Sequence, residues 1–454
     1  MQRGEHDQME NPMKVVIVGG SLTGLMCGIA LKQAGNDVKI LEREDDERES
    51  HMAGVCLGVD AGDFLALHDR QTGVFSHRCL RIQALKRDES VQVFVNARRD
   101  ITNWDTFYYR LRSNLDGYTS THYPAPSQTA ETDGSVAYER YSQVLDVGPS
   151  PSSPGKMRLT VQRRGAEHRL QIDADLVIGA DGPDSFIRSR YQPHVRREYA
   201  GYVAWRGTVP ESEVSESTRH LFRRSVTVFM MEGHHHCLVY TIPGKDGSLE
   251  PGEKYLNFLW YTNHSEEELQ DIMVDAVDGH RHHNIVPRGR VRQDIWERQL
   301  QRAREIPFAG PFLEVITQIR QPFVQVVTDF CSTQAAFEGG KVLLVGDGLS
   351  LFRPHTAFSG TQAAFHALRT AELVKGKISV QKWEETVLRY SRIHWLQSIW
   401  YGEFYQGTMT KAFMSAIRFW AYCGVDRIKS WWRGEESLLR GTSSRVEAYE
   451  DEVV

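Results

Sequence analysis

The sequence predicts an α/β protein with three parts: a Rossmann-type domain, an inserted and mostly antiparallel β-sheet domain, and C-terminal helices. Three observations lead to this prediction. An apolar strand near the start runs into a glycine-rich turn, a helix and a second strand. Another apolar strand, far downstream, ends in Gly346-Asp347. Between them, residues 195–305 contain aromatic strand patterns without the alternation of strand and helix that defines the first part.

The first unit has the order expected of a nucleotide-binding βαβ motif. Residues 14–18 are a strand of mostly β-branched residues, residues 25–34 have helical character, and residues 37–41 form the second strand, closed by Glu42. The turn between them would hold a pyrophosphate at the helix N-terminus, and its residues are Gly19, Gly20, Ser21, Leu22, Thr23 and Gly24. Ser21 replaces the usual second glycine. Glu42 would accept hydrogen bonds from ribose hydroxyls; an ordinary solvated strand end is the less favoured alternative.

The late strand, residues 341–345, meets the other half of an extended cofactor and therefore favours FAD over NAD. Asp347 can accept a hydrogen bond from a ribityl hydroxyl, although capping of the turn explains it equally well on local grounds. Gly360 and Thr361 precede a helix predicted over residues 363–374. The amides at that N-terminus would face the flavin pyrimidine ring, because a helix dipole stabilises negative charge there. An FAD-dependent oxidoreductase is the resulting hypothesis.

The remaining elements define the domains. Residues 104–115 form a helix, residues 119–155 are loops around short strands, and residues 175–182 are a strand ending in a turn. Strands over residues 201–207, 237–240 and 255–261 build the inserted domain. We assign residues 12–75, 101–194 and 306–375 to the FAD-binding domain, 76–100 and 195–305 to the substrate domain, 376–434 to the helical region and 435–454 to a polar tail.

Composition excludes several other classes. The 454 residues carry a formal charge of -5, which gives no electrostatic case for nucleic-acid binding. The start of the chain is polar, and no apolar run is long enough to span a bilayer. Six scattered cysteines favour reduced thiols in a cytoplasmic enzyme. We expect no metal site, because adjacent residues of a strand point to opposite faces and His234-His235-His236 cannot present three ligands together.

These motifs resemble those of the class A flavoprotein monooxygenases, the aromatic hydroxylases of the para-hydroxybenzoate hydroxylase fold, and most of all the 2,6-dihydroxypyridine 3-hydroxylase branch. Three motifs occur in the order found in the family: the turn GGSLTGL, the segment DLVIGADGPDSFIR at 175–188, and Gly346-Asp347 with Arg353-Pro354-His355. Segments WDTFYYRLRSNLDG, YAGYVAWRGTVPE and YLNFLWY are also similar to this branch. The resemblance covers residues 13 to 400. One departure is Gly348–Phe352, where the family has small residues.

The resemblance implies a reaction. NADPH or NADH would reduce FAD, and a C4a-hydroperoxyflavin formed with O2 would hydroxylate an electron-rich aromatic or heteroaromatic small molecule. It also implies roles for residues. Basic side chains near the FAD phosphates or ribityl chain would be Arg43, Arg48 and one of Arg110 and Arg112, with Arg110 preferred and a solvated helix face for the other. Asp181 would take part in FAD and NAD(P)H handling, and Pro354 would lie beside the isoalloxazine. For Asp181, maintenance of the fold is an equally good reading. Candidate catalytic or substrate-contacting residues are His236, Tyr240 and His355.

Three alternatives stay open. The same fold supports epoxidation or Baeyer–Villiger oxidation of a natural product. A non-catalytic flavin-binding protein is conceivable because of the altered 348–352 stretch. The aromatic C-terminal helices could cover the pocket, form the surface of a homodimer or touch a membrane, and amphipathic core helices are the default.

Overall fold

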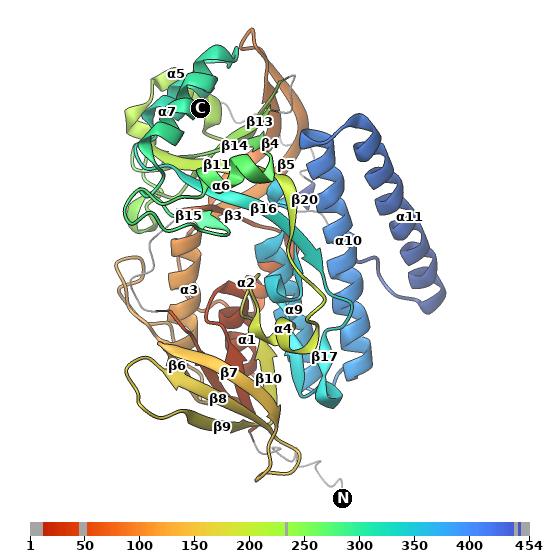
Figure 1. The fold of residues 1–454 in the computed structure, drawn as a ribbon. Helices are drawn as coiled ribbons and strands as arrows, with labels where there is room; N and C mark the ends of the chain where they lie inside the picture. The colour runs from red at the N-terminus through yellow and green to blue at the C-terminus, as the bar shows by residue number, and fades with distance from the viewer. Residues whose placement is uncertain (1–11, 45–51, 232–234, 440–443, 446–454) are drawn as a thin grey trace, which may run out of the picture.

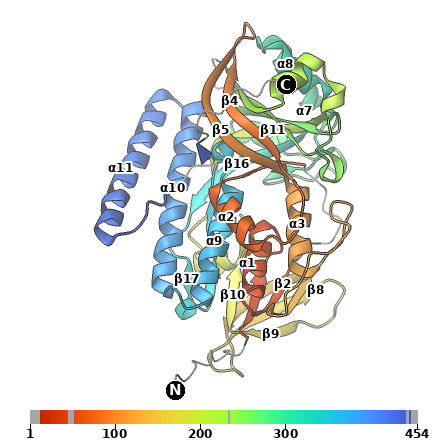
Figure 2. The ribbon, with the colours of Figure 1, turned by 180° about the vertical axis from the view of Figure 1, so that it is seen from behind.

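The structure, a computed structural model, describes residues 12–44, 52–231, 235–439 and 444–445. It has a lower domain around a parallel sheet and an upper domain around a large antiparallel sheet, with two long helices along one side (Figure 1). Viewed from behind, α1, α2 and α9 cover one face of the parallel sheet (Figure 2). The predicted fold class is confirmed.

The lower sheet has six strands in the order β17-β18-β10-β1-β2-β6. Its strands are β17 (Ala336–Phe337), β18 (Val342–Leu344), β10 (Leu176–Gly179), β1 (Lys14–Val18), β2 (Asp37–Leu41) and β6 (Val136–Glu139). All pairs are parallel except β17 with β18. A separate three-stranded sheet contains β7 (Ser142–Pro149), β8 (Met157–Arg163) and β9 (Leu170–Ala174). The central position of β1, between β2 and β10, places the glycine turn at the middle of the sheet edge.

The upper sheet runs in the order β15-β16-β11-β14-β13-β12-β4-β5-β20, with β3 paired to β5 and β19 to β16. Its strands are β15 (Ile285–Val286), β16 (Phe323–Cys331), β11 (Glu198–Pro210), β14 (Tyr255–Asn263), β13 (His235–Ile242), β12 (Ser225–Met231), β4 (His77–Leu85), β5 (Val91–Asn103), β20 (Ser444–Arg445), β3 (Gly54–Leu57) and β19 (Ser350–Leu351). Pairing is antiparallel apart from β12 with β4. β16 belongs to this sheet, although the expected boundary at residue 306 puts its sequence in the FAD-binding domain. Its hydrogen bonds to β11, which local sequence does not reveal, determine this membership.

Helices connect and cover the two sheets. They are α1 (Leu22–Lys32), α2 (Val59–His68), α3 (Trp104–Asp116), α4 (Phe186–Tyr191), α5 (Glu216–Phe222), α6 (Glu266–Ile272), α7 (Gln293–Glu305), α8 (Gly310–Gln318), α9 (Ser359–Val374), α10 (Val380–Gln406) and α11 (Met409–Arg433). Short 3-10 turns occupy Glu211–Glu213, Lys245–Gly247, Glu338–Gly340, Gly346–Gly348 and Pro354–Thr356. α1 begins at Leu22 rather than at the predicted Leu25, with Ser21 at its N-cap, so the helix follows the turn at once.

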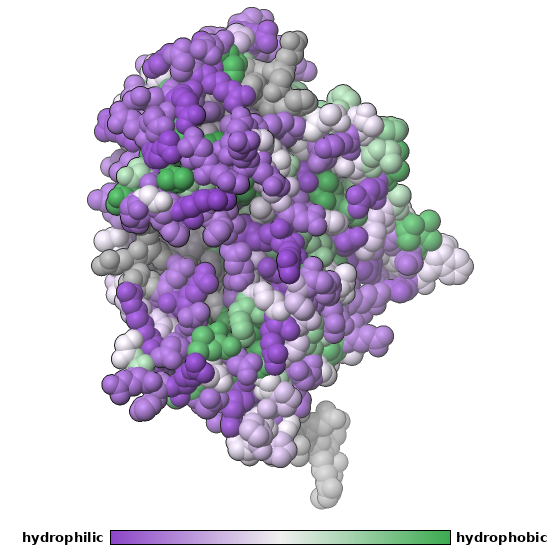
Figure 3. Space-filling view, in the orientation of Figure 1, coloured by the Kyte–Doolittle hydropathy of each residue, from purple (hydrophilic) through white to green (hydrophobic). Residues whose placement is uncertain are grey.

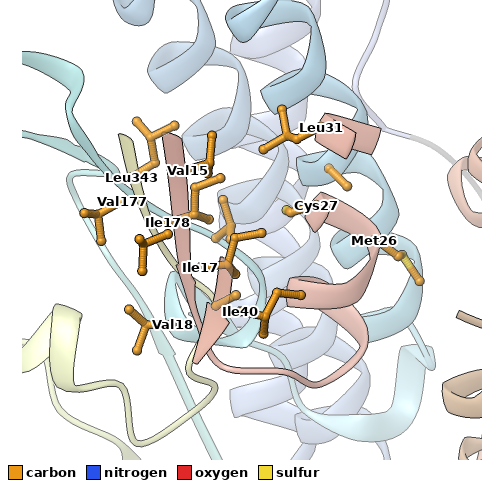
Figure 4. Packing of buried hydrophobic residues seen from close by; sticks show 14 of the residues in the cluster. Val15, Ile17, Val18, Met26, Cys27, Leu31, Ile40, Val177, Ile178 and Leu343 are labelled. Atoms are coloured by element: carbon orange, nitrogen blue, oxygen red, sulfur yellow. The ribbon is translucent and has the colours of Figure 1, made fainter. Parts of the chain in front are cut away.

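The lower domain has a continuous apolar core between the sheet and helices α1 and α9 (Figure 4). Ile17, Ile40, Ile178 and Leu343 are fully buried on adjacent strands. Gly28 in α1 lies so close to this sheet that a Cβ on it would come within 3.1 Å of Ile40 on β2 and 3.7 Å of Ile17 on β1. The close packing of α1 on β1 therefore holds the turn between them in a fixed position.

Candidate functional site

A groove of about 610 Å³ runs between the two domains. One end is lined by the glycine turn and the end of β2, through Gly19, Ser21, Leu22, Thr23 and Glu42. The other end is lined by residues of the upper sheet, namely Arg206, Tyr240, Leu259, Gln325 and Val327. The Gly-Asp turn after β18 and the start of α9 lie between these ends, through Asp347, Pro354, Ser359 and Gly360. The groove thus brings together motifs from opposite ends of the sequence.

The glycine turn is shaped by close backbone approach. Gly19 has φ +101°, and a Cβ on it would lie 2.4 Å from the carbonyl oxygen of Ala180. Gly20 donates its backbone N–H to Glu42 Oε2 at 2.8 Å, and the backbone N–H of Glu44 donates to Glu42 Oε1 at 3.0 Å. Glu42 therefore orders the turn as well as lining the groove. Gly24 lies inside α1, where a Cβ would clash with the carbonyl of Gly19.

Two carboxylates in the groove have an oxygen with no hydrogen-bond partner in the described part of the chain: Asp181 Oδ1 and Asp347 Oδ1. Ile187 donates its N–H to the second oxygen of Asp181 at 3.2 Å. Burial raises the pKa of Asp181, and it raises the pKa of Asp347 to about 6. Buried carboxylate oxygens normally have donors. These two therefore fit a ligand that brings hydroxyl groups, as the ribityl chain and ribose of FAD do.

The start of α9 lies at the groove through Ser359, Gly360 and Ala363. Thr361, which the sequence suggests as a cofactor residue, is buried and accepts the backbone N–H of Gly58 at 3.2 Å. It fixes the N-terminus of α2 and does not line the groove. Arg43 lines the groove beside Glu44, and the Arg48 prediction lies outside the described residues.

Arg110 is placed elsewhere by the structure. Its Nε donates to Asp69 at 2.6 Å, and its Nη atoms donate to the carbonyls of Gln71 and Thr72. Together with Thr106 of the same helix, it lines a separate cavity of about 280 Å³. The helical spacing correctly predicted α3, but it did not reveal which face of the helix meets the groove.

The sequence reasoning missed two basic residues of the groove, Arg197 and Arg206. Arg206 donates to Gln325 Oε1 at 2.9 Å, and Arg197 donates to both oxygens of Asp184 at 3.0 Å. Strand alternation could have identified Arg206, because Tyr202, Ala204 and Arg206 share one face of β11. Arg197 precedes that strand and carried no comparable signal.

The three predicted catalytic residues separate into two places. Tyr240 lines the groove and packs on β3, where a Cβ on Gly54 would lie 2.4 Å from its ring. His236 and His355 lie with ring centroids 5.6 Å apart, and Tyr261 packs against both of them. Burial lowers the pKa of His236 to about 3 and that of His355 well below its usual value, so both are neutral at physiological pH.

Two segments are rich in histidine, His234-His235-His236 and His280-Arg281-His282-His283. Within the described residues, no group of three His, Cys, Asp or Glu side chains is arranged to hold an ion. His282 Nε2 instead pairs with Asp275 at 2.8 Å. His234 lies outside the described residues.

The comparisons with known proteins agree with the geometry. Two family models match: "Pyridine nucleotide-disulphide oxidoreductase" over residues 14–53 and "FAD binding domain-like" over residues 199–329. The chain is 28% identical to 2,6-dihydroxypyridine 3-monooxygenase of Paenarthrobacter nicotinovorans, over 83% of this chain and 87% of the relative.

Solved structures show the same fold. 2,6-dihydroxypyridine-3-hydroxylase from Arthrobacter nicotinovorans matches with a TM-score of 0.73 and 23% identity, over 87% of this chain and 93% of that one. HpxO of Klebsiella pneumoniae, solved with FAD and uric acid, matches with a TM-score of 0.62 and 16% identity, over 89% and 92% of the two chains. The resemblance predicted from the sequence is thereby confirmed.

Proposed function

We propose that this chain, a relative of the FAD-dependent aromatic monooxygenases, uses NAD(P)H and O2 to hydroxylate an electron-rich aromatic or heteroaromatic small molecule. The observation that carries the proposal is the single groove. It joins the glycine turn at Gly19 to a chamber lined by Tyr240, Leu259 and Arg206. The resemblance to the 2,6-dihydroxypyridine hydroxylase branch supports a phenol or hydroxypyridine as substrate.

The residues of the lower domain would bind and orient the cofactor. Backbone amides at Gly19 to Leu22 would hold the pyrophosphate, and Glu42 would accept from the ribose. Asp181 and Asp347 would accept from hydroxyls through their unpartnered oxygens. Bound FAD supplies the redox chemistry: it accepts hydride from NAD(P)H and, once reduced, activates O2.

The residues of the upper sheet would bind the substrate. Leu259, Val327 and Phe352 provide apolar walls that exclude water. Burial raises the pKa of Tyr240 to about 12, so its hydroxyl stays protonated and can donate a hydrogen bond to the substrate. The guanidinium of Arg206 opposes that shift, and the same charge favours a substrate bound as its phenolate. A phenolate ring is richer in electrons and is therefore hydroxylated more readily.

His236 and His355 would act behind this chamber. Both carry ring nitrogens without a partner in the described part of the chain, and both are neutral. A neutral imidazole can accept or donate a hydrogen bond, so these rings could pass a proton between hydroxyl groups, as the hydrogen bond between the Tyr202 hydroxyl and His355 would allow. We keep them as candidate relay residues.

The cysteines bear on the compartment in which the protein works. No disulfide joins any two of the six cysteines, all of which the structure describes, and this supports a reducing compartment such as the cytoplasm. No described helix is long and apolar enough to cross a membrane.

The test begins with the absorbance spectrum and the cofactor released on denaturation. We expect FAD, and we expect phenols or hydroxypyridines to stimulate NADPH or NADH oxidation and to gain one oxygen from labelled O2. Arg206→Met should raise KM for the phenolic substrate while FAD stays bound. A ring-opened or ester product would move the assignment to Baeyer–Villiger chemistry. If the bound flavin is not reduced by NADPH or NADH with any ligand tested, the proposal that the protein is an enzyme is wrong.

A further inference from the structure

The C-terminal helix α11 exposes a large apolar surface. Nine of its apolar side chains have exposed fractions between 46% and 77%, and they are Met409, Phe413, Met414, Ile417, Trp420, Val425, Ile428, Trp431 and Trp432. We call this set the outer face of α11. Scattered exposed apolar residues are normal, but a contiguous set of this size marks an interaction surface.

The outer face is opposite the side that packs on α10. Ala412, Phe419, Asp426 and Ser430 are buried and recur at helical spacing along the inner side. The apolar residues recur at the same spacing, three and four, on the outside. α11 lies at the edge of the molecule, and green surface gathers where it is exposed (Figures 1 and 3). The fold therefore uses one side of α11 and leaves the other to solvent.

Basic residues border the outer face on both sides. At 100° per residue, Lys411, Arg418 and Lys429 fall on one flank and Arg427 on the other. All four are exposed. The single acidic residue of the helix, Asp426, is buried and accepts from Arg389 Nε at 2.8 Å. The exposed side of α11 is thus apolar in its centre and purely basic at its margins.

We propose that α11 docks the protein on the surface of an anionic lipid bilayer, with its outer face in the interface and its axis along the membrane plane. An apolar stripe with tryptophans, bordered by Lys and Arg, is the composition that partitions into the headgroup region. The basic margins match the negative potential of anionic lipids. The helix need not span the bilayer, and no described helix is suited to do so.

A second copy of the chain fits this surface less well. If two α11 helices packed face to face about a two-fold axis, either orientation would bring a basic flank against a basic flank. Like charges at close range oppose such an interface. Because Asp426 points inward, α11 provides no acidic partner for Arg418 or Lys429. Charge complementarity therefore favours the lipid surface.

The experiment is flotation of the FAD-loaded full chain with vesicles of phosphatidylcholine, with and without phosphatidylglycerol. We expect the protein to float with the anionic vesicles and to be released by high salt. Arg418→Glu/Lys429→Glu should reduce the partition coefficient more than about tenfold. Trp420→Gln/Ile428→Gln should reduce it similarly, because both side chains are more than half exposed, although the Trp420 ring also packs against Trp400 and Phe419.

Matched controls separate docking from general charge and folding effects. The control Arg169→Glu/Arg304→Glu makes the same change of charge at exposed positions outside α11. The control Leu67→Gln/Val277→Gln replaces two exposed apolar side chains outside α11 by glutamine. Both should float like the unchanged protein. Equal binding to pure phosphatidylcholine, or no binding to either vesicle, would overturn the proposal. So would a stable dimer in solution that Trp420→Gln/Ile428→Gln dissociates.

Discussion

The Tyr202 hydroxyl and His355 Nε2 share a hydrogen bond of 2.8 Å. It joins β11 of the upper sheet to the Pro354–Thr356 turn, which borders the groove. Arg353, one residue earlier, is held by Asp329 at 2.7 Å and by Glu403 at 3.0 Å. The turn that carries Pro354 is therefore fixed from the sheet on one side and from α10 on the other.

Tyr202→Phe should lower the free energy of unfolding by about 1 to 2 kcal/mol, because it removes a buried hydrogen bond and leaves His355 Nε2 unpaired. Urea unfolding measures this. Tyr199→Phe is a matched control, since its hydroxyl donates to the backbone carbonyl of His264 at 3.0 Å, away from the groove. If only Tyr202→Phe changes kcat or its pH profile, His355 acts as a relay; a change in neither variant would refute that role.

Gly19→Ala should abolish FAD binding and destabilise the lower domain by several kcal/mol, on the order of 3. A Cβ there would lie 2.4 Å from a carbonyl oxygen, at a φ of +101°. Gly62→Ala is the control, because it lies within α2 with no atom within 4 Å of the added Cβ. It should leave FAD affinity unchanged and stabilise slightly. The flavin content of each purified variant measures its FAD binding. A Gly19→Ala protein with full flavin content would exclude this turn as the pyrophosphate site.

Asp347 should make the stability of the cofactor-free protein depend on pH. Its pKa is about 6 in the fold and near 3.8 when unfolded, so the fold favours the neutral carboxyl. The neutral carboxyl therefore stabilises the fold fully at pH values below about 4, and this stabilisation is lost as the pH rises through about 6. The loss should be less than about 3 kcal/mol, because the carboxyl is only half-buried. Urea unfolding of Asp347→Asn should lack this component; identical pH profiles for the two proteins would contradict it.

Arg110→Met tests the placement of this arginine outside the groove. Its nearly buried partner Asp69 would lose its cation and keep only the hydrogen bonds from the Gln71 backbone and the Asn114 side chain, which should cost about 3 kcal/mol of stability. FAD affinity, measured by fluorescence quenching, should stay within about twofold, in contrast to Asp347→Ala. A tenfold loss of FAD affinity in Arg110→Met alone would restore the role that the family resemblance implies.

Arg353→Met should destabilise the protein by about 3 to 5 kcal/mol, because Asp329 and Glu403 lose their shared cation in a buried site. Thermal unfolding gives the change. The double variant Arg353→Met/Asp329→Asn should recover part of the loss, since it removes one of the stranded charges. No recovery would mean that packing of the arginine stem, rather than its charge, stabilises this turn.

The sequence predicted the parts of the molecule that depend on local pattern. The βαβ unit from Lys14 to Leu41, the helix at Trp104 and the aromatic strands were all expected near their observed bounds. The periodicity of hydrophobic residues and the residue types at turns define such elements, and the order of motifs along the chain identified the family.

What local pattern could not supply was orientation across long distances. The sheet membership of β16 depends on pairing with β11, which lies far earlier in the chain. Arg110 and Thr361 face away from the groove because of neighbours at Asp69 and Gly58. His236 and His355 were predicted as separate candidates, and only the packing of β13 against the turn and α10 places their rings together.

The strand order of the lower sheet also bears on how the protein is made. β1 pairs with β10, which begins only at Leu176, and β10 pairs in turn with β18, which begins only at Val342. During synthesis the emerging glycine turn therefore lacks two of the strands that complete its surroundings until translation has passed Val342. Long-range parallel pairing of this kind closes slowly and leaves apolar edges exposed in the meantime. The flavin cannot act as an early template for folding, and a nascent chain halted before Leu344 should depend on chaperones and remain colourless.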